Sequence, residues 1–253
     1  MIIDLEINDK KYQADLAQPL DISIPLGQVK CFYAPDVMME PYTDGDFIGS
    51  VNRGAPVNFY NVQLNPHGNG THTECLGHIT KAQESVNKIL TNYHFAAYLV
   101  TVPLDTLDNE DQVITLNQLN PQLPTKIPQA IIIRTSPNNI DKKTKDYSGT
   151  NPPYIAAEAM RFLVNQGVQH LLIDTPSVDR EVDEGLLAAH HIFWGLDADG
   201  NTIDTTRTKA TITELIYVDN DIVDGYYLLN LQIAPLELDA SPSKPILYKL
   251  NSI

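Results

Sequence analysis

Basic residues, cysteines and long hydrophobic runs are all scarce in this sequence. Only 17 residues are Lys or Arg, against 32 Asp or Glu, so the net charge is −15 at pH 7. Such a chain repels nucleic-acid phosphates and anionic membrane surfaces, and we expect neither nucleic acid nor a membrane as partner. No apolar stretch approaches the length of a membrane span, and the first residues lack the pattern of a signal peptide.

The cysteine content excludes a protein held together by disulfides. Cys31 and Cys75 are the only two cysteines, too few for a disulfide framework, and this number fits a reducing compartment. We therefore predict a cytoplasmic protein. The 253 residues are 43% hydrophobic, which is enough to build the core of a single domain over residues 1–253.

Two β-branched runs, 98–102 and 130–135, predict strands buried on both faces at the centre of a sheet. A helix is predicted to open at Pro152 and to stop at Gly167, and a third apolar run, 168–174, follows it. A helix between two apolar strands indicates a right-handed βαβ unit with parallel pairing. The predicted fold class is therefore α/β, with a mixed β-sheet.

Other parts of the chain give shorter signals. Two alternating runs near the start predict a hairpin or two separate sheet strands. An Asp-Gly pair at 199–200 is typical of a hairpin turn, because the terminal Glu of a calcium loop is missing. The predicted short elements are strands at 1–7, 20–26, 57–62, 226–233 and 245–248, and a short helix near 116–119.

Residues 65–78 hold the densest cluster of metal-ligating side chains. Three of the seven histidines, His67, His72 and His78, lie here with Glu74 among glycines. If residues 71–75 are extended, His72 and Glu74 point to the same side, and a helical turn after Glu74 would bring His78 to them. Imidazole and carboxylate are ordinary ligands of zinc, manganese or iron. The alternative is a polar loop whose histidines only form hydrogen bonds with their neighbours.

Residues 70–78 (Gly-Thr-His-Thr-Glu-Cys-Leu-Gly-His) resemble a family hallmark, His-x-Gly-Thr-His-x-Asp-x-Pro-x-His. The family is that of the cyclase-like metal-dependent hydrolases, which include bacterial kynurenine formamidase (arylformamidase) and isatin hydrolase. Three differences are visible. His67 lies five residues before His72 where the family has four, Glu74 replaces the family Asp, and Leu76 lies near the family Pro.

The rest of the chain continues the resemblance in the family's order. Residues 174–179 resemble its Asp-x-x-Ser-x-Asp, His190 falls in its Ala-His helix, and Glu214 lies in the counterpart of its Glu-Asn-Leu. Residues 235–242 resemble its C-terminal signature, and 193–209 look like an insertion. The resemblance runs from about residue 22 to 247 and implies the family's swivelling β/β/α architecture.

The resemblance also implies roles for individual side chains. His78 would be the general acid/base, and Phe32 or Tyr33 would line a substrate pocket, although both could equally be core aromatics. The cofactor would be a divalent metal, zinc or manganese, with one or two ions. The implied metal ligands are His67, His72, Glu74, His190 and Glu214, with His190 preferred over His191.

The implied activity is cleavage of the amide bond in a small aryl formamide, amide or lactam, by metal-activated water. The family tends to form dimers, so we expect a homodimer with a small-molecule substrate. The alternative is a metal-free binding protein that keeps the fold without the activity. A Cys75–His78 pair and Ser177 are weaker candidates for a nucleophile, because neither lies in a known nucleophile motif. His94 and His170 stand alone in apolar surroundings and are predicted to be core or partly buried histidines.

Overall fold

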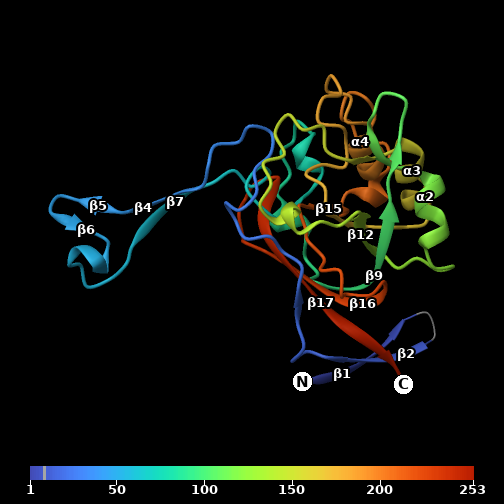
Figure 1. Cartoon of the computed structure of the whole chain (residues 1–253), viewed down its shortest axis with the longest axis horizontal. Coiled ribbons are helices and arrows are strands. Elements are labelled where there is room, and N and C mark those ends of the chain that lie inside the picture. The colour runs from blue at the N-terminus through green and yellow to red at the C-terminus, as the bar shows by residue number, and fades with distance from the viewer. Residues whose placement is uncertain (8–9) are drawn as a thin grey trace.

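The computed structural model describes residues 1–7 and 10–253. Its main sheet closes on itself, because β8 pairs with β15 on one side and with β17 on the other. Figure 1 shows strands β9, β12, β15, β16 and β17 of this sheet in the body of the molecule. The pairs β9–β12, β12–β14 and β14–β15 are parallel, and the other pairs around this barrel are antiparallel, which confirms the predicted α/β class with a mixed sheet. In order around the barrel the strands are β8 (His72–Glu74), β17 (Ala240–Ser252), β16 (Gly225–Ile233), β9 (His94–Pro103), β12 (Ala130–Ser136), β14 (His170–Ile173) and β15 (Thr211–Glu214).

The N-terminal segment extends the main sheet instead of entering the barrel. β1 (Ile2–Ile7) pairs with β2 (Lys10–Asp15), which pairs with the end of β17. A hairpin between 1–7 and 20–26 is therefore wrong, and only Leu20–Asp21 of the second run forms a strand, β3. The remaining strands form small sheets: β4 (Met38–Pro41) with β7 (Tyr60–Gln63), β5 (Thr43–Asp44) with β6 (Phe47–Ile48), and β10 (Asp105–Thr106) with β11 (Gln112–Ile114) and β13 (Tyr154–Ile155).

The predicted βαβ unit is present as β12, helix α3 (Ala157–Asn165) and β14, with β12 and β14 parallel. α3 begins later than predicted, because residues 154–155 pair with β11 before the helix starts. Gly167 has φ +83°, a left-handed conformation that suits the predicted stop. Among the described residues no helix is long and apolar enough to span a membrane. The other helices are α1 (Val86–Ile89), α2 (Leu116–Leu119, as predicted) and α4 (Ala188–Trp194).

Alternation along β12 builds two hydrophobic clusters, one on each side of the sheet. Ile131 and Ile133 pack in the cluster that includes residues of α3 and α4, whereas Ile132 packs in the cluster with residues of β16 and β17. All three side chains are completely buried, which confirms a strand covered on both faces. The Asp-Gly pair also lies in a turn, where Leu196 pairs with Thr202.

The two isolated histidines differ in environment. His94 is exposed and contacts Asn230, so the prediction of a buried residue is wrong for it. His170 is buried, its Nδ1 lies 2.9 Å from Thr211 Oγ1, and its ring centroid lies 4.0 Å from that of Phe95. Burial, with a smaller contribution from the charge of Arg207, lowers the pKa of His170 to about 4.

This low pKa predicts an acid-sensitive contribution to stability. The unfolded chain binds a proton at His170 below pH about 6.5, whereas the folded protein resists it down to about pH 4, so stability is lost as pH falls through that window. Between pH 7 and pH 4.5 the wild type should lose roughly 2 to 3 kcal/mol more unfolding free energy than His170→Asn. Urea unfolding at both pH values measures this difference. Equal losses in the two proteins would contradict it.

Candidate metal centre

Strand β8 carries two of the predicted ligands and places them beside a third. His72 and Glu74 lie on the same side of β8, as their spacing predicts, and Glu214 of β15 is the register partner of His72. Thr73 between them points away, where its hydroxyl meets that of Thr213 at 2.8 Å. Closure of the barrel therefore brings two carboxylates and an imidazole to one point of the sheet.

The imidazole of His72 is completely buried and has one nitrogen without a hydrogen-bond partner. Its Nδ1 lies 3.0 Å from the carbonyl oxygen of Gly70 and donates to it, which leaves Nε2 with a free lone pair. Nε2 lies 3.4 Å from Glu214 Oε2. A buried acceptor without a partner costs about 1–3 kcal/mol, and a metal ion removes that cost. A buried imidazole nitrogen of this kind, with a free lone pair beside a carboxylate, is typical of a metal ligand.

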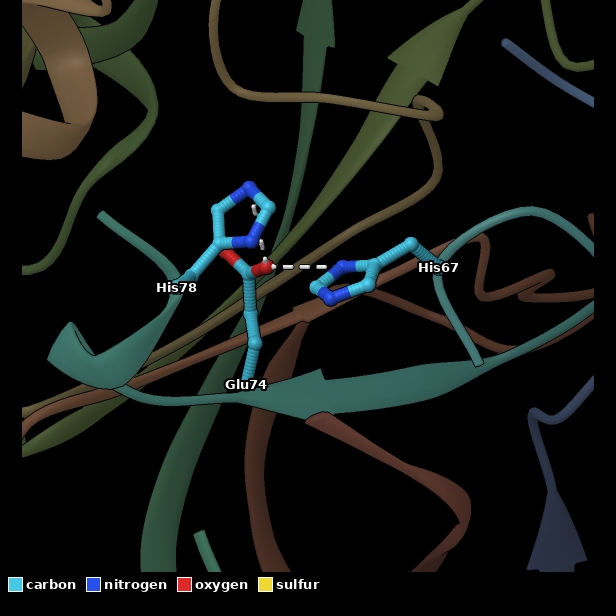
Figure 2. Close-up of side chains that lie close together, drawn as sticks. All are labelled: His67, Glu74 and His78. Carbon is cyan, nitrogen blue, oxygen red and sulfur yellow. Dashed lines mark ion pairs between the residues drawn. The ribbon is translucent and has the colours of Figure 1, made fainter. Parts of the chain in front are cut away.

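Glu74 is the centre of the cluster. Its Oε1 lies 3.1 Å from His190 Nε2, and its Oε2 lies 3.2 Å from His67 Nδ1. Figure 2 shows its carboxylate between the rings of His67 and His78. Complete burial would raise the pKa of this carboxyl, but the charge of His78 and the hydrogen bonds of His190 and His67 outweigh it and hold the pKa well below its ordinary value.

The loop before β8 absorbs the extra residue that separates His67 from His72. Asn65 accepts a hydrogen bond from the backbone N–H of Gly68 through its side chain, and its own N–H donates to the side chain of Asn69 at 2.7 Å. A Cβ on Gly68 would lie 2.3 Å from Cβ of Ala34, so only glycine fits there. The turn keeps His67 Nδ1 within reach of Glu74 despite the longer interval.

A tight turn after β8 brings His78 back to the cluster. Residues Leu76–His78 form a single 3₁₀ turn, and His78 Nε2 lies 3.9 Å from Glu74 Oε2. Gly77 makes the turn possible because a Cβ there would lie 2.1 Å from the carbonyl oxygen of Glu84. The predicted convergence of Glu74 and His78 is therefore present.

Asp239 is a member of the cluster that the sequence analysis did not assign. Its Oδ2 lies 2.8 Å from His67 Nε2 and 3.2 Å from His78 Nδ1. These contacts lower the pKa of Asp239 well below its ordinary range. Burial disfavours the charged form of His67, but hydrogen bonds to Asp239 and Glu74 prevail and raise the pKa of His67 to about 10. The only sequence signal was its place within residues 235–242, which resemble the family's C-terminal signature.

Helix α4 presents His190, and Asp179 orients it. The backbone N–H groups of Ala189 and His190 donate to the Asp179 carboxylate, which also lies 2.7 Å from His190 Nδ1. Burial disfavours a charged His190, but Asp179 and Glu74 outweigh burial and raise its pKa well above the ordinary value. The adjacent His191 is absent from the cluster, so the structure brings in the histidine that the resemblance preferred.

The residues present fit a divalent metal. Two trios each bring one ligand atom per residue within 4.8 Å of one another, and they share Glu74. One trio is fully buried, whereas the other includes the partly exposed His78. A shared carboxylate suits one ion or two bridged ions. His190 contacts both carboxylates, because its Nε2 lies 3.1 Å from Glu74 Oε1 and 4.0 Å from Glu214 Oε1. The two trios are His72, Glu74 and Glu214, and His67, Glu74 and His78.

The cluster opens into a cavity of about 370 Å³. Phe32 lines it, whereas Tyr33 does not and is 77% exposed. Both residues have a left-handed backbone, with φ of 55° and 54°, and this fixes which of the two aromatic rings faces the cavity. Arg180 also lines the cavity, held by Asp111 at 2.8 Å; the sequence analysis missed it. The cavity is further lined by Ala34, Asn65, His67, Gly68, His78, Ser177, Glu181, Asp183, Leu187, His190 and Glu214.

The rival nucleophiles are poorly placed. Cys75 is fully buried, and its Sγ donates to the carbonyl of Glu84 at 3.3 Å. Burial raises the pKa of its thiol to about 12, so it stays protonated at neutral pH. Ser177 lines the cavity, but its hydroxyl accepts the N–H of Asp179 and so stabilises the turn that positions Asp179.

Comparison with known proteins agrees with this arrangement. The profile of the family described as putative cyclase matches residues 14–180, which include His67, His72, Glu74 and His78. The chain belongs to this family.

Curated relatives and solved structures extend the match to most of the chain. A kynurenine formamidase from Bordetella petrii is 24% identical over 241 residues, covering 91% of this chain and 98% of that protein. One from Bacillus cytotoxicus is 31% identical over 123 residues, about half of each chain. Isatin hydrolase A from Labrenzia aggregata, solved with benzyl benzoate, superimposes with a TM-score of 0.63 at 15% identity, over 92% of this chain and 95% of that one. The structural likeness confirms the fold.

We predict that His72→Ala and His190→Ala each lose metal, whereas His191→Ala retains it. Each removed ring takes a nitrogen away from the carboxylates of the cluster, whereas His191 is the next residue on the same helix and lies outside the cluster. Elemental analysis of protein purified without chelator measures this. Equal metal content in His72→Ala and the wild type would remove His72 from the ligand set.

His67→Ala tests the ligand affected by the longer loop. Because its Nδ1 lies 3.2 Å from Glu74, we expect a loss of metal here too. Full metal content after this substitution would show that the extra residue has displaced His67 from the metal.

Asp239→Asn should weaken metal binding by roughly 10- to 100-fold, the usual effect of removing a group that orients a ligand. The variant keeps the shape of the side chain but loses the charge that holds His67 Nε2 and His78 Nδ1. Zinc titration against a competing chelator measures the affinity. Glu237→Gln is the matched control, since Glu237 is an exposed acid two residues away that pairs with Lys88. An unchanged affinity in Asp239→Asn would contradict the orienting role.

Proposed function

We propose that this protein is a metal-dependent hydrolase that cleaves the C–N bond of a small aryl formamide, amide or lactam, as in N-formylkynurenine. The observation that carries the proposal is the buried, unpartnered Nε2 of His72, which lies in a trio with two carboxylates beside a cavity lined by Phe32. This donor set suits zinc or manganese, and the cavity of about 370 Å³ has the size of a small-molecule site.

The ligands proposed for one or two ions are His67, His72, Glu74, His190 and Glu214. When bound, such an ion lowers the pKa of a coordinated water toward neutrality and polarises a carbonyl group. The chain itself orients the ligand rings: Gly70 and Asp179 accept from Nδ1 of His72 and of His190, so that each Nε2 faces the carboxylates. The N–H of Val178 donates to Glu214 Oε1 and fixes that carboxylate.

His78 is proposed as the group that moves the proton. Its Nδ1 donates to Asp239, so Nε2 is the nitrogen available to receive a proton from water and deliver it to the departing amine nitrogen. His78 lines the cavity and its side chain is 31% exposed, whereas His72 is completely buried. Among the four imidazole rings of the cluster, that of His78 is the most exposed, which suits a group that exchanges protons. Phe32 supplies an aromatic wall against which an aryl group can pack.

The relatives support this choice of chemistry. The alignment with one protein named kynurenine formamidase covers 98% of that protein at 24% identity, and isatin hydrolase A has a similar fold. The homodimer and the cytoplasmic location expected from the sequence belong to the same proposal. Two free, buried cysteines are consistent with a reducing compartment.

The rival proposal is a small-molecule-binding protein that retains the fold without metal. Metal analysis separates the two, since the hydrolase requires near-stoichiometric zinc or manganese in protein purified without chelator. Absence of metal, with no hydrolysis after zinc or manganese is added back, would favour the binding protein.

The purified protein is expected to hydrolyse N-formylkynurenine or isatin, and His78→Ala should do so at least about 100-fold more slowly while keeping its metal. A general acid/base outside the ligand set can be removed without losing the ion, so metal content and rate should separate. Parallel measurement of both, with His94→Ala as a control at an exposed histidine, tests this. Loss of metal in His78→Ala together with retention in His72→Ala would reverse the assigned roles.

A further inference from the structure

The cavity beside the metal cluster contains a cationic side chain that the proposed chemistry does not use. Among the described residues that line this cavity, Arg180 is the only Lys or Arg, and its side chain is 37% exposed. The chain as a whole is acidic, with a net charge of −15. A guanidinium group stays charged at any physiological pH and matches the geometry of a carboxylate. Arg180 therefore offers an anionic ligand a place in a protein that otherwise repels it.

Asp111 holds the guanidinium of Arg180 in one orientation. Nε of Arg180 donates to Oδ2 of Asp111 at 2.8 Å, and Nη2 donates to Oδ1 at 3.1 Å. Such a two-point contact fixes the plane of the guanidinium as well as its position. Nη1 donates to the backbone carbonyl of Val182 at 2.8 Å. The side chain is thus fixed at three points before any ligand arrives.

Asp111 is in turn held by residues outside the metal cluster. It is 1% exposed, and its carboxylate accepts hydrogen bonds from the side chains of Asn109, Asn151 and Tyr154 at 2.9, 2.7 and 2.9 Å. Asp111 immediately precedes β11, and Tyr154 lies in β13, which pairs with β11. The small sheet beside the barrel therefore positions the arginine.

The guanidinium keeps donors for a ligand. An arginine side chain has five N–H groups, and the contacts with Asp111 and Val182 use three of them. One N–H on Nη1 and one on Nη2 have no acceptor in the part of the chain that the structure describes. Two N–H groups on neighbouring nitrogens can bind both oxygens of one carboxylate.

The acidic residues of the cavity are already engaged elsewhere. Glu181 accepts the backbone N–H groups of Gly149 and Asn151, at 2.6 and 3.0 Å. Asp183 accepts two backbone N–H groups of its own loop, at 2.9 and 2.7 Å. Over residues 1–7 and 10–253, neither carboxylate forms an ion pair with Arg180. These acids therefore leave the free edge of the guanidinium to a ligand.

Arg180 is coupled in position to the metal cluster. It directly follows Asp179, whose carboxylate lies 2.7 Å from Nδ1 of His190. The Cα atoms of consecutive residues are about 3.8 Å apart, so one peptide unit links the residue that orients a proposed metal ligand to the residue that offers the free N–H groups. A ligand bound at Arg180 is therefore held at a fixed place relative to the cluster.

We propose that Arg180 determines specificity by binding a carboxylate of the substrate at a point remote from the bond that is cut. The inference rests on the proposed function in taking this cavity as the substrate site. The substrate class is then narrowed to aryl formamides or amides that carry a carboxylate. Of the two substrates named above, N-formylkynurenine carries such a group and isatin does not.

Titration calorimetry on the zinc-loaded protein tests the recognition without turnover. The probes are kynurenine, which is N-formylkynurenine without its formyl group, and kynuramine, the same molecule without the carboxylate. The wild type should bind kynurenine at least about tenfold more tightly, the usual effect of a hydrogen-bonded charged group. Arg180→Gln combined with Asp111→Asn removes both charges and leaves no buried carboxylate unpaired. This double variant should bind kynurenine at least about tenfold more weakly and kynuramine unchanged.

Arg161→Gln is the matched control, because Arg161 is an exposed arginine of α3 that does not line the cavity. It should leave both affinities unchanged. Equal affinities of the wild type for the two probes, or no binding of kynurenine at millimolar concentration, would overturn the inference. So would an equal loss of both probes in the double variant, which indicates a structural role only, or a preference for kynurenine that survives there, which indicates that its carboxylate binds the metal.

Turnover gives a second readout. In the double variant KM for N-formylkynurenine should rise about tenfold with kcat little changed, because the lost contact is remote from the reacting bond. A fall in kcat at constant KM would contradict the role in binding. A protein that shows the Arg180-dependent preference in calorimetry and hydrolyses no formamide would refute the proposed hydrolase activity and leave the carboxylate site in place.

Discussion

The structure depends on one electrostatic constraint: the carboxylate of Glu74 is kept charged where water cannot reach it. Burial of an unpaired carboxylate costs several kcal/mol, so every oxygen must face a cationic group or a metal. Three imidazole nitrogens lie between 3.1 and 3.9 Å from its oxygens, and they come from the loop before β8, the turn after it and helix α4. Closure of the barrel at β8 is what lets these distant segments converge, so the fold and the candidate site depend on the same strand.

Around this centre, each imidazole has one nitrogen engaged by a hydrogen-bond acceptor farther out. The acceptor decides which nitrogen faces inward, because the nitrogen that donates to it must point outward. Four rings use the backbone carbonyl of Gly70 or the carboxylates of Asp179 and Asp239 in this way. The outer carboxylates are those of Asp179 and Asp239, and neither lies in the same helix or strand as the ring that it contacts. The orientation of the rings therefore depends on the tertiary structure. A metal entering this site would meet ligands whose orientation is already set.

This division explains how much could be predicted from the sequence. The alternation of His72 and Glu74 and the βαβ unit depend on local periodicity, and both are present. Asp239 lies 161 residues after His78, and its role depends on the pairing of β17 with β8, so no local periodicity indicates it. The choice between Phe32 and Tyr33 was left open because it depends on two left-handed backbone angles rather than on residue type. The exposure of His94 was likewise decided by the pairing of its strand.

Strand β7 shows a second limit of prediction from the sequence. An alternating run at 57–62 correctly indicates a strand, seen at Tyr60–Gln63, but the pattern cannot say what the strand packs against. In a folded chain, apolar side chains are exposed in groups only where another surface is required. Such a group occurs on the ribbon of β4 to β7, residues 38–63, and the ribbon leaves the body of the protein between Ala34 and Asn65, which line the cavity. The ribbon ends only four residues before His67, so the segment that follows it contributes directly to the wall of the cavity.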